Sequence, residues 1–442
     1  MRLLVVSARH HPEQGGIGTS VQSFVDAARL AGWHLDLMTR RGGDPTPAST
    51  NFEISTLDEH SDFQERVPVL RRIERIRPYR YGLWSLGVAE FLLTCEPNYD
   101  AVLFMDIQAE GLVSICSRAV RHHFVGVPFL VMAHGPMALA ETVSGYDSNR
   151  FGRSIYHEWE RLALSHADGV IGASNVLLDS IGPLEYSCAI PPLIDPLQTS
   201  DFESHEPVIV LVGDVDSHKG PDVWARSLNR VFRQVRDVRA ELIGHDTPNG
   251  PEGTSLAAHV YSLIDPQHRR RFIWRGHLSH AKTLEAIDRS ALVVVPSRFD
   301  GFSYVAAEAI LRTRPLIVSD QVGIVDWVSG LATVPAGNAD ALAQCQIQVL
   351  QQSATWKIRM QAIRQQLVEA CSPHRCLDSF ETFIHSCHGL KSRFNSDANV
   401  EMIDTMKSWL ADIESLERQS RRQVQVETMR PRNFTPQVVP TR

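Results

Sequence analysis

The sequence of 442 residues lacks several features that mark specialised classes of protein. Its seven cysteines are scattered and form no Cys-x-x-Cys pair, which argues against a disulfide framework and against zinc-finger spacing. It has no run of about 18 apolar residues that could span a membrane. The apolar run at residues 3–6 is too short for a secretory signal peptide. These absences predict a cytoplasmic protein with reduced thiols. Attachment to the inner membrane face stays open as an alternative.

The sequence also lacks an excess of positive charge. Its formal net charge is −7, so its charge balance does not predict binding to nucleic acid. Hydrophobic residues make up 43% and charged residues 21%, which is ordinary for a water-soluble globular protein. The length is sufficient for two domains and a tail.

The N-terminal region predicts the opening of a doubly wound α/β domain. An apolar strand at residues 3–7 is followed by Gly15-Gly16-Ile17-Gly18 and then by apolar residues at helical spacing. The dinucleotide fingerprint would need a third glycine where Val21 stands, so the pattern disfavours a dehydrogenase. The glycines at 16 and 18 fit either a tight turn or the close approach of a ligand to the backbone.

The most informative stretch is residues 296–308, which follow an apolar strand at 291–295 and lead into a helix at 305–311. A tight turn at Gly301 joins them, and a helix start exposes unpaired backbone N–H groups that attract phosphate. Asp300 and Glu308 flank this start. Carboxylates repel phosphate but accept hydrogen bonds from sugar hydroxyls. The combination indicates a nucleotide-sugar ligand.

Further candidate residues follow predicted strands, at the edge where parallel α/β sheets bind ligands. His134 follows a strand at 128–133, Gly213 and Lys219 follow a strand at 208–212, Gly244 follows 239–243, and His277 follows 272–274. Strand–helix alternation over both halves of the chain therefore predicts two facing α/β domains with a ligand in the cleft between them.

The stretch from Pro296 to Glu308 resembles the signature of the family-four retaining glycosyltransferases with the GT-B fold, also called glycosyl transferases group 1. In that signature seven residues separate two carboxylates; the first is usually glutamate, whereas this chain has Asp300. Other segments resemble the family in the same order over residues 1–388. They are the glycine loop at 15–18, His134, residues 168–174 and 191–195, Lys219-Gly220 and residues 323–326.

The resemblance implies two Rossmann-like doubly wound domains facing each other. Residues 1–200 would form an acceptor domain and residues 201–372 a nucleotide-sugar donor domain. Residues 373–388 would form a closing helix that packs back on the first domain. Residues 389–442 lie beyond the resemblance, and their own pattern predicts a tail, first helical and then disordered and basic.

The implied reaction is transfer of a sugar from a UDP- or GDP-sugar to an acceptor hydroxyl with retention, in polysaccharide or glycoconjugate synthesis. The acceptor would be a polysaccharide, a lipid-linked molecule or a small molecule. No cofactor and no metal are implied beyond the donor. By the family's pattern His134 and Asp300 contact the donor sugar, Lys219 holds the diphosphate and Glu308 the ribose. The wider predicted donor site comprises Gly16, Gly18, Gly213, Gly244, His277, Arg298, Gly301, Phe302, Ser303, Tyr304 and Glu308.

One position departs from the family. Asp214 stands where the family has an arginine that binds the diphosphate. A carboxylate near a diphosphate is repulsive by about 1 kcal/mol or more. Arg298 or Arg275 would have to supply the missing charge. This departure keeps open a catalytically silent nucleotide-sugar-binding protein on the same fold, and a nucleotide-sugar epimerase is a further alternative.

Residues 66–80 hold six arginines among apolar residues at helical spacing. Such a segment fits either a solvated helix or peripheral contact with an anionic membrane.

Overall fold

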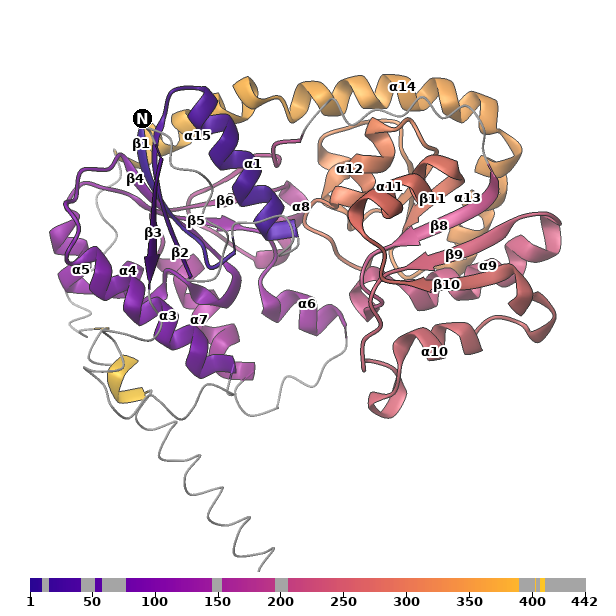
Figure 1. The fold of residues 1–442 in the computed structure, drawn as a ribbon, viewed down its shortest axis with the longest axis horizontal. Coiled ribbons are helices and arrows are strands. Elements are labelled where there is room, and N and C mark those ends of the chain that lie inside the picture. The colour runs from indigo at the N-terminus through magenta and orange to yellow at the C-terminus, as the bar shows by residue number, and fades with distance from the viewer. Residues whose placement is uncertain are drawn as a thin grey trace, which may run out of the picture.

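The computed structural model describes residues 1–9, 16–40, 52–57, 77–144, 153–194, 206–388, 402 and 406–409. Two α/β units lie side by side, each built on its own parallel sheet with helices on both faces (Figure 1). This arrangement confirms the predicted α/β class with two Rossmann-like domains.

The first sheet has seven strands in the order β3-β2-β1-β4-β5-β6-β7, and all pairings are parallel. Strands β4 and β5 are apolar and buried along their whole length, because helices cover both faces of the sheet. The strands are β1 (Arg2–Val6), β2 (His34–Arg40), β3 (Phe52–Leu57), β4 (Ala101–Met105), β5 (Phe129–Ala133), β6 (Gly169–Gly172) and β7 (Ser187–Ala189).

The helices of the first domain are α1 (Gly16–Leu30), α3 (Arg77–Leu92), α4 (Leu112–Cys116), α5 (Arg118–His123), α6 (Met137–Val143), α7 (Arg153–His166) and α8 (Asn175–Ile181), with a 3-10 turn η3 (Ile107–Ala109). The sequence pattern over residues 109–122 predicts a single helix, and this prediction is wrong, because the structure has two short helices there, α4 and α5. Ser117 is extended between α4 and α5, and its hydroxyl accepts a hydrogen bond from the backbone N–H of Val120. A serine cap of this kind starts a new helix.

The second sheet has six parallel strands in the order β10-β9-β8-β11-β12-β13. They are β8 (Glu206–Val212), β9 (Arg239–Ile243), β10 (Phe272–Gly276), β11 (Ser290–Val295), β12 (Leu316–Ser319) and β13 (Ala332–Val334). The helices are α9 (Pro221–Gln234), α10 (Leu256–Ser262), α11 (His280–Arg289), α12 (Tyr304–Leu311) and α13 (Ala339–Gln351); the 3-10 turns are η4 (Ser217–Lys219), η5 (Pro251–Gly253), η6 (Pro266–Arg271) and η7 (Gly323–Asp326). The strand order changes direction between β8 and β11. A doubly wound sheet binds ligands at such a point.

The chain returns to the first domain through α14 (Ser353–Ala370) and α15 (Pro373–His388). Figure 1 shows α14 running along the second domain toward the first, where α15 lies beside α1. The rings of Phe24 in α1 and Phe380 in α15 are 4.7 Å apart between centroids. The closing helix predicted at 373–388 is therefore seated on the first domain by aromatic packing.

Several predicted features lie wholly or largely outside the described residues. They are the domain boundary near residue 200, most of the basic segment at 66–80, and nearly all of the tail at 389–442. Of the tail, Met406 is buried and Lys407 Nζ lies 2.9 Å from Glu90 Oε1 in α3. None of the helices described has the length and apolar character needed to cross a membrane.

Candidate functional site

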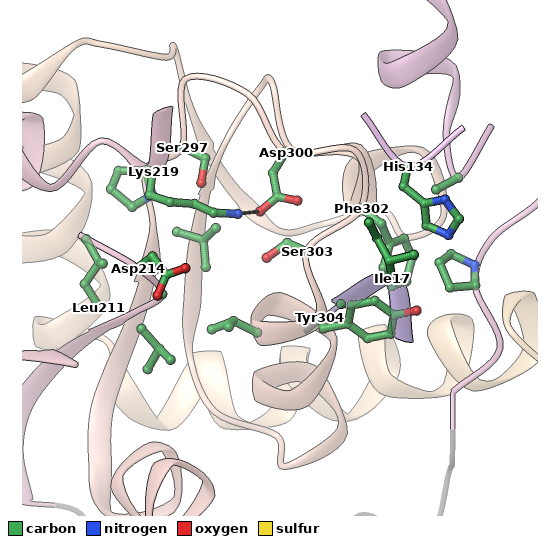
Figure 2. A pocket seen from close by; sticks show the side chains of 18 of the residues that line it. Ile17, His134, Leu211, Asp214, Lys219, Ser297, Asp300, Phe302, Ser303 and Tyr304 are labelled. Atoms are coloured by element: carbon green, nitrogen blue, oxygen red, sulfur yellow. Dashed lines mark hydrogen bonds and ion pairs between the residues drawn. The ribbon is translucent and has the colours of Figure 1, made fainter. Parts of the chain in front are cut away.

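A pocket of about 470 Å³ lies between the two domains (Figure 2). Both sheets contribute the loops that follow their strands, as expected for ligand sites of α/β folds. The lining residues are Arg9, Gly16, Ile17, His134, Ala173, Pro192, Leu211, Val212, Gly213, Asp214, Lys219, Val294, Val295, Pro296, Ser297, Asp300, Phe302, Ser303, Tyr304 and Val305. Eight of the predicted site residues, from both domains, are thus brought together: Gly16, His134, Gly213, Lys219, Asp300, Phe302, Ser303 and Tyr304.

The loop between β8 and α9 brings Lys219 to the pocket. Lys219 ends the turn η4, and Gly220 follows it with φ of 70°. A Cβ atom at Gly220 would lie 2.2 Å from the carbonyl oxygen of Pro296, so only glycine allows the loop to pack against the end of β11. The loop is therefore fixed against the same residues that lead to Asp300.

Lys219 and Asp300 form an ion pair in the pocket. Lys219 Nζ lies 2.7 Å from Asp300 Oδ2, and both side chains are partly buried. Figure 2 shows the lysine extended toward Asp300, with His134 on the other side of that carboxylate. A ligand that uses both groups has to loosen this pair. An incoming phosphate can take the lysine, and an incoming hydroxyl can take the carboxylate.

The start of α12 faces the same space. Ser303 has φ of 76° and ψ of 95°, and its hydroxyl accepts a hydrogen bond from the backbone N–H of Ala306. A positive φ at a serine is strained, and such strain is concentrated at functional sites. The first N–H groups of α12 and its dipole favour negative charge at this end of the helix.

His134 approaches from the first domain on the loop after β5. Its Nδ1 lies 3.2 Å from the carbonyl oxygen of Met132, and its buried Nε2 has no hydrogen-bond partner among the described residues. Gly301 permits this approach, since a Cβ there would lie 3.0 Å from the His134 carbonyl oxygen. Ser174 in the first domain also donates a hydrogen bond to the Gly301 carbonyl, 2.7 Å away. The two halves of the site are thus held in contact through backbone at Gly301.

Three of the predicted residues lie just outside the lining. Gly18 is buried within α1. A Cβ at Gly244 would lie only 1.8 Å from the Gly213 carbonyl oxygen, which places Gly244 directly behind the loop between β8 and α9. Gly301 lies between Asp300 and Phe302, both of which line the pocket. These three glycines thus lie next to the pocket lining without belonging to it.

Glu308 and His277 are not among the residues that line the pocket, and each contacts another histidine. Glu308 Oε1 accepts a hydrogen bond from His280 Nε2 at 2.7 Å, and this contact raises the pKa of His280. His277 stacks on His245 with 3.9 Å between ring centroids. Glu308 lies on α12, the helix after β11, and His277 directly follows β10. Their proposed contacts with the nucleotide stay predictions.

The two arginines that could compensate for Asp214 are engaged elsewhere. Arg298 donates to both carboxylate oxygens of Asp222, each at 2.8 Å, and its pKa is raised by that pair. Arg275 pairs with the buried Glu241 at 2.6 Å. Neither lines the pocket. Arg298 also donates to the carbonyl oxygen of Ser217, so it links the loop between β8 and α9 to α9 itself. A role in donor binding stays a prediction for it.

Sequence reasoning missed Arg9 and Asp216. Arg9 follows β1 by three residues and lines the pocket. Its position just after a parallel strand is the sequence signal that predicts it, because ligands of α/β sheets bind at the carboxyl ends of the strands. Asp216 stands two residues after Asp214, as Asp214-Val215-Asp216, and turns away to accept from Asn249 Nδ2 at 2.7 Å. It also accepts from the Ser144 hydroxyl of the first domain at 2.9 Å. Of these two aspartates, Asp214 is the one that lines the pocket.

Two buried carboxyl groups, Asp106 and Glu160, lie behind the His134 loop and were also missed. Glu160 accepts hydrogen bonds from the backbone N–H groups of Gln108, at 3.2 Å, and Ala138, at 3.3 Å. Burial, followed by the nearby charge of Asp106, raises the pKa of Glu160 to about 8. The protonated form of the Glu160 carboxyl group therefore predominates at neutral pH.

Replacing Glu160 by glutamine should flatten the dependence of stability on pH. The raised pKa means that folded Glu160 binds an extra proton between its unfolded value of 4.5 and about 8. Its stability contribution is complete below pH 4.5 and is lost as pH rises toward 8, by at most about 1.4 kcal/mol per pH unit. Urea unfolding from pH 5 to 8.5 measures this. Glu285→Gln, at an exposed position, serves as control. Parallel profiles for wild type and Glu160→Gln would contradict the assignment.

Two family profiles match the chain. Residues 15–184 match the glycosyl transferase 4-like domain, and residues 206–352 match the glycosyl transferases group 1. Among named relatives, a glycogen synthase of Mycobacterium tuberculosis (strain CDC 1551 / Oshkosh) is 24% identical over 83% of this chain and 90% of its own length. An alpha-D-kanosaminyltransferase of Streptomyces kanamyceticus is 28% identical over 29% of this chain and 33% of its own.

Solved structures show the same fold. A sucrose-phosphate synthase from Thermosynechococcus elongatus superimposes with a TM-score of 0.66 at 19% identity, over 87% of this chain and 98% of that one. An E. coli trehalose-6-phosphate protein bound with UDP-2-fluoro glucose gives 0.62 at 15% identity, over 88% and 100%. At these identities the likeness concerns the arrangement of the two domains.

Proposed function

Because this chain belongs to the group 1 glycosyl transferases, sugar-transferring enzymes of GT-B type, we propose that it moves a sugar from a nucleotide-diphosphate-sugar to an acceptor hydroxyl with retention of configuration. The supporting observation is the pocket itself. A lysine, a helix start and a carboxylate of the second domain face a histidine of the first domain within one space of about 470 Å³.

Each group in the pocket has a role that its chemistry supports. Lys219 and the first N–H groups of α12 stabilise the diphosphate as it leaves with the electron pair of the sugar C1–O bond. Asp300 and His134 accept hydrogen bonds from sugar hydroxyls and orient the ring. The acceptor oxygen bonds to C1 on the same face, and its proton passes to the leaving phosphate. Because the phosphate takes the proton, Asp300 acts through hydrogen bonding and no covalent sugar–Asp300 intermediate is needed.

We place the reaction in polysaccharide or glycoconjugate synthesis. Relatives are named as a glycogen synthase, an alpha-D-kanosaminyltransferase and a D-inositol 3-phosphate glycosyltransferase. The acceptor would enter from the first domain, whose pocket-lining residues include the cation Arg9. We extend the proposal to a UDP- or GDP-sugar as the donor, to a cytoplasmic location, and to peripheral membrane contact through residues 66–80.

Asp214 favours one alternative, a protein that binds a nucleotide-sugar or a partner and does not turn over. It brings a carboxylate into the pocket at the position of the family's arginine, and Lys219 is already paired with Asp300. The two proposals differ in a single measurable quantity, the release of nucleotide.

A screen of UDP- and GDP-sugars separates them. Calorimetry measures donor binding, and a nucleotide-release assay with and without chelator measures turnover. We expect saturable binding of one base class, with release that chelator leaves unchanged. Glu308→Ala should weaken binding about 10-fold or more, because a charged hydrogen bond is lost. Glu285→Ala, at an exposed position of the same domain, should bind as wild type does. Binding without release would support the silent alternative. No binding to any donor would refute the proposal.

A further inference from the structure

Asp106 is a fully buried carboxylate directly behind His134. It follows β4, and since β4 and β5 are parallel neighbours, the ends of both strands meet at one edge of the first sheet. The backbone N–H of Asp106 donates to the carbonyl oxygen of Met132, 3.1 Å away. Its side chain has no exposed surface and, unlike His134, is not among the residues that line the pocket. A charge in this place has to act through a neighbour.

The two carboxylate oxygens of Asp106 face the His134 loop. Oδ2 accepts a hydrogen bond from the backbone N–H of Gly135 at 3.0 Å. Oδ1 lies 3.7 Å from His134 Nδ1 and, among the described residues, has no hydrogen-bond partner. One carboxylate thus fixes the turn that carries His134 and presents a second oxygen to the imidazole ring.

Among the described residues, the two polar contacts of His134 Nδ1 are with oxygen atoms. The carbonyl oxygen of Met132 lies 3.2 Å away and Asp106 Oδ1 lies 3.7 Å away. The carbonyl oxygen can only accept, and so does a carboxylate, so the ring hydrogen belongs on Nδ1. A neutral imidazole then has a bare Nε2. Nε2 is buried and has no hydrogen-bond partner among the residues described. The His134 side chain that carries it lines the pocket.

We propose that Asp106 is a positioning residue that fixes the His134 ring hydrogen on Nδ1 and so presents a bare Nε2 as the acceptor for a hydroxyl of the sugar in the pocket. The identity of the hydroxyl-bearing ligand rests on the proposed function. The tautomer itself rests on the contacts of the ligand-free protein. Glu160 lies in the same buried cluster and accepts hydrogen bonds from the backbone N–H groups of Gln108 and Ala138.

The tautomer can be read directly by ¹⁵N NMR of histidine-labelled protein at pH 7.5, because bare and hydrogen-bearing ring nitrogens differ strongly in shift. The chain has 19 histidines, so His134→Gln assigns the resonances. We expect hydrogen on Nδ1 alone in wild type. Hydrogen on Nε2, or on both nitrogens, would overturn the proposal, whatever the stability of any Asp106 variant.

Asp106→Asn then tests the cause. The Gly135 N–H needs an oxygen acceptor, so the amide NH₂ turns toward Nδ1 and favours hydrogen on Nε2 instead. We expect the tautomer to shift and kcat/KM to fall about 10–100-fold, as for other groups that orient a histidine. Glu160→Gln, an equivalent change in the same network, should keep the wild-type tautomer. If Asp106→Asn also keeps it, the Met132 carbonyl alone sets the tautomer and Asp106 is structural.

The ligand is tested with UDP-glucose against UDP. UDP-glucose should shift the Nε2 resonance and UDP should not, since only the former carries sugar hydroxyls into the pocket. Binding of UDP-glucose without a shift at Nε2 would refute the hydroxyl contact. If calorimetry shows that UDP-glucose does not bind, the same comparison is run with the donor that does. If no donor binds, the proposed function fails, and the spectra of the free protein still decide the tautomer.

Discussion

Replacing Lys219 by alanine should lower kcat/KM with the preferred donor by about 10²–10³, the loss seen when one group that stabilises developing charge is removed. The reason is the shortage of positive charge in the pocket. Among the described residues that line it, the full cations are Arg9 and Lys219, and Lys219 alone belongs to the second domain. The leaving diphosphate would lose its only lysine.

Two controls make the result specific. Lys282→Ala removes an exposed lysine of the same domain and should leave kcat/KM unchanged. Lys219→Arg keeps the charge and should recover part of the activity. The loss of the ion pair with Asp300 should cost only about 1 kcal/mol of stability, because both side chains keep contact with solvent. A Lys219→Ala variant that folds and retains full activity would show that the phosphate is held elsewhere.

The sequence was sufficient for the fold because its strong patterns are local. Buried strands such as β4, β5 and β11 are short apolar runs followed by a polar residue or proline, and helices alternate with them. Strand ends in one parallel sheet share an edge, so Lys219 and Asp300, which follow β8 and β11, could be predicted to lie near one another. His134 follows a strand of the other sheet, and its place across the cleft came from the prediction of two facing domains. The break between α4 and α5 was missed because Ser117 is a weak local signal within an apolar, helical pattern.

The other half of the site depends on contacts that sequence spacing does not encode. Asp106 and Gly135 are 29 residues apart, and Ser174 and Gly301 are 127 apart. The pairing of Lys219 with Asp300 and of Arg298 with Asp222 is decided by side-chain geometry at the point where β8 and β11 meet. For the same reason the sequence could name Arg298 as a candidate for the missing charge, whereas the structure shows its guanidinium held by Asp222.

Asp214→Arg should strengthen donor binding about 10–100-fold. Asp214 is exposed to the pocket and lies on the Lys219 side of it (Figure 2). The substitution removes a carboxylate that repels the diphosphate and adds a guanidinium that can bind phosphate through two N–H groups. Charges a few ångströms apart near a protein surface interact by about 1–4 kcal/mol, and each 1.4 kcal/mol is tenfold in affinity. Calorimetry with the preferred donor, and with the bare nucleotide, measures the change.

Asp214→Asn divides that effect into its two parts, because the amide removes the negative charge without adding a positive one. If repulsion dominates, asparagine should give most of the gain, and the gain should shrink as salt rises. If a missing phosphate ligand dominates, only arginine should strengthen binding. Weaker binding in both variants would show that Asp214 contacts the donor favourably through a hydroxyl or backbone group. Asp214 would then contribute to donor recognition, in spite of its charge.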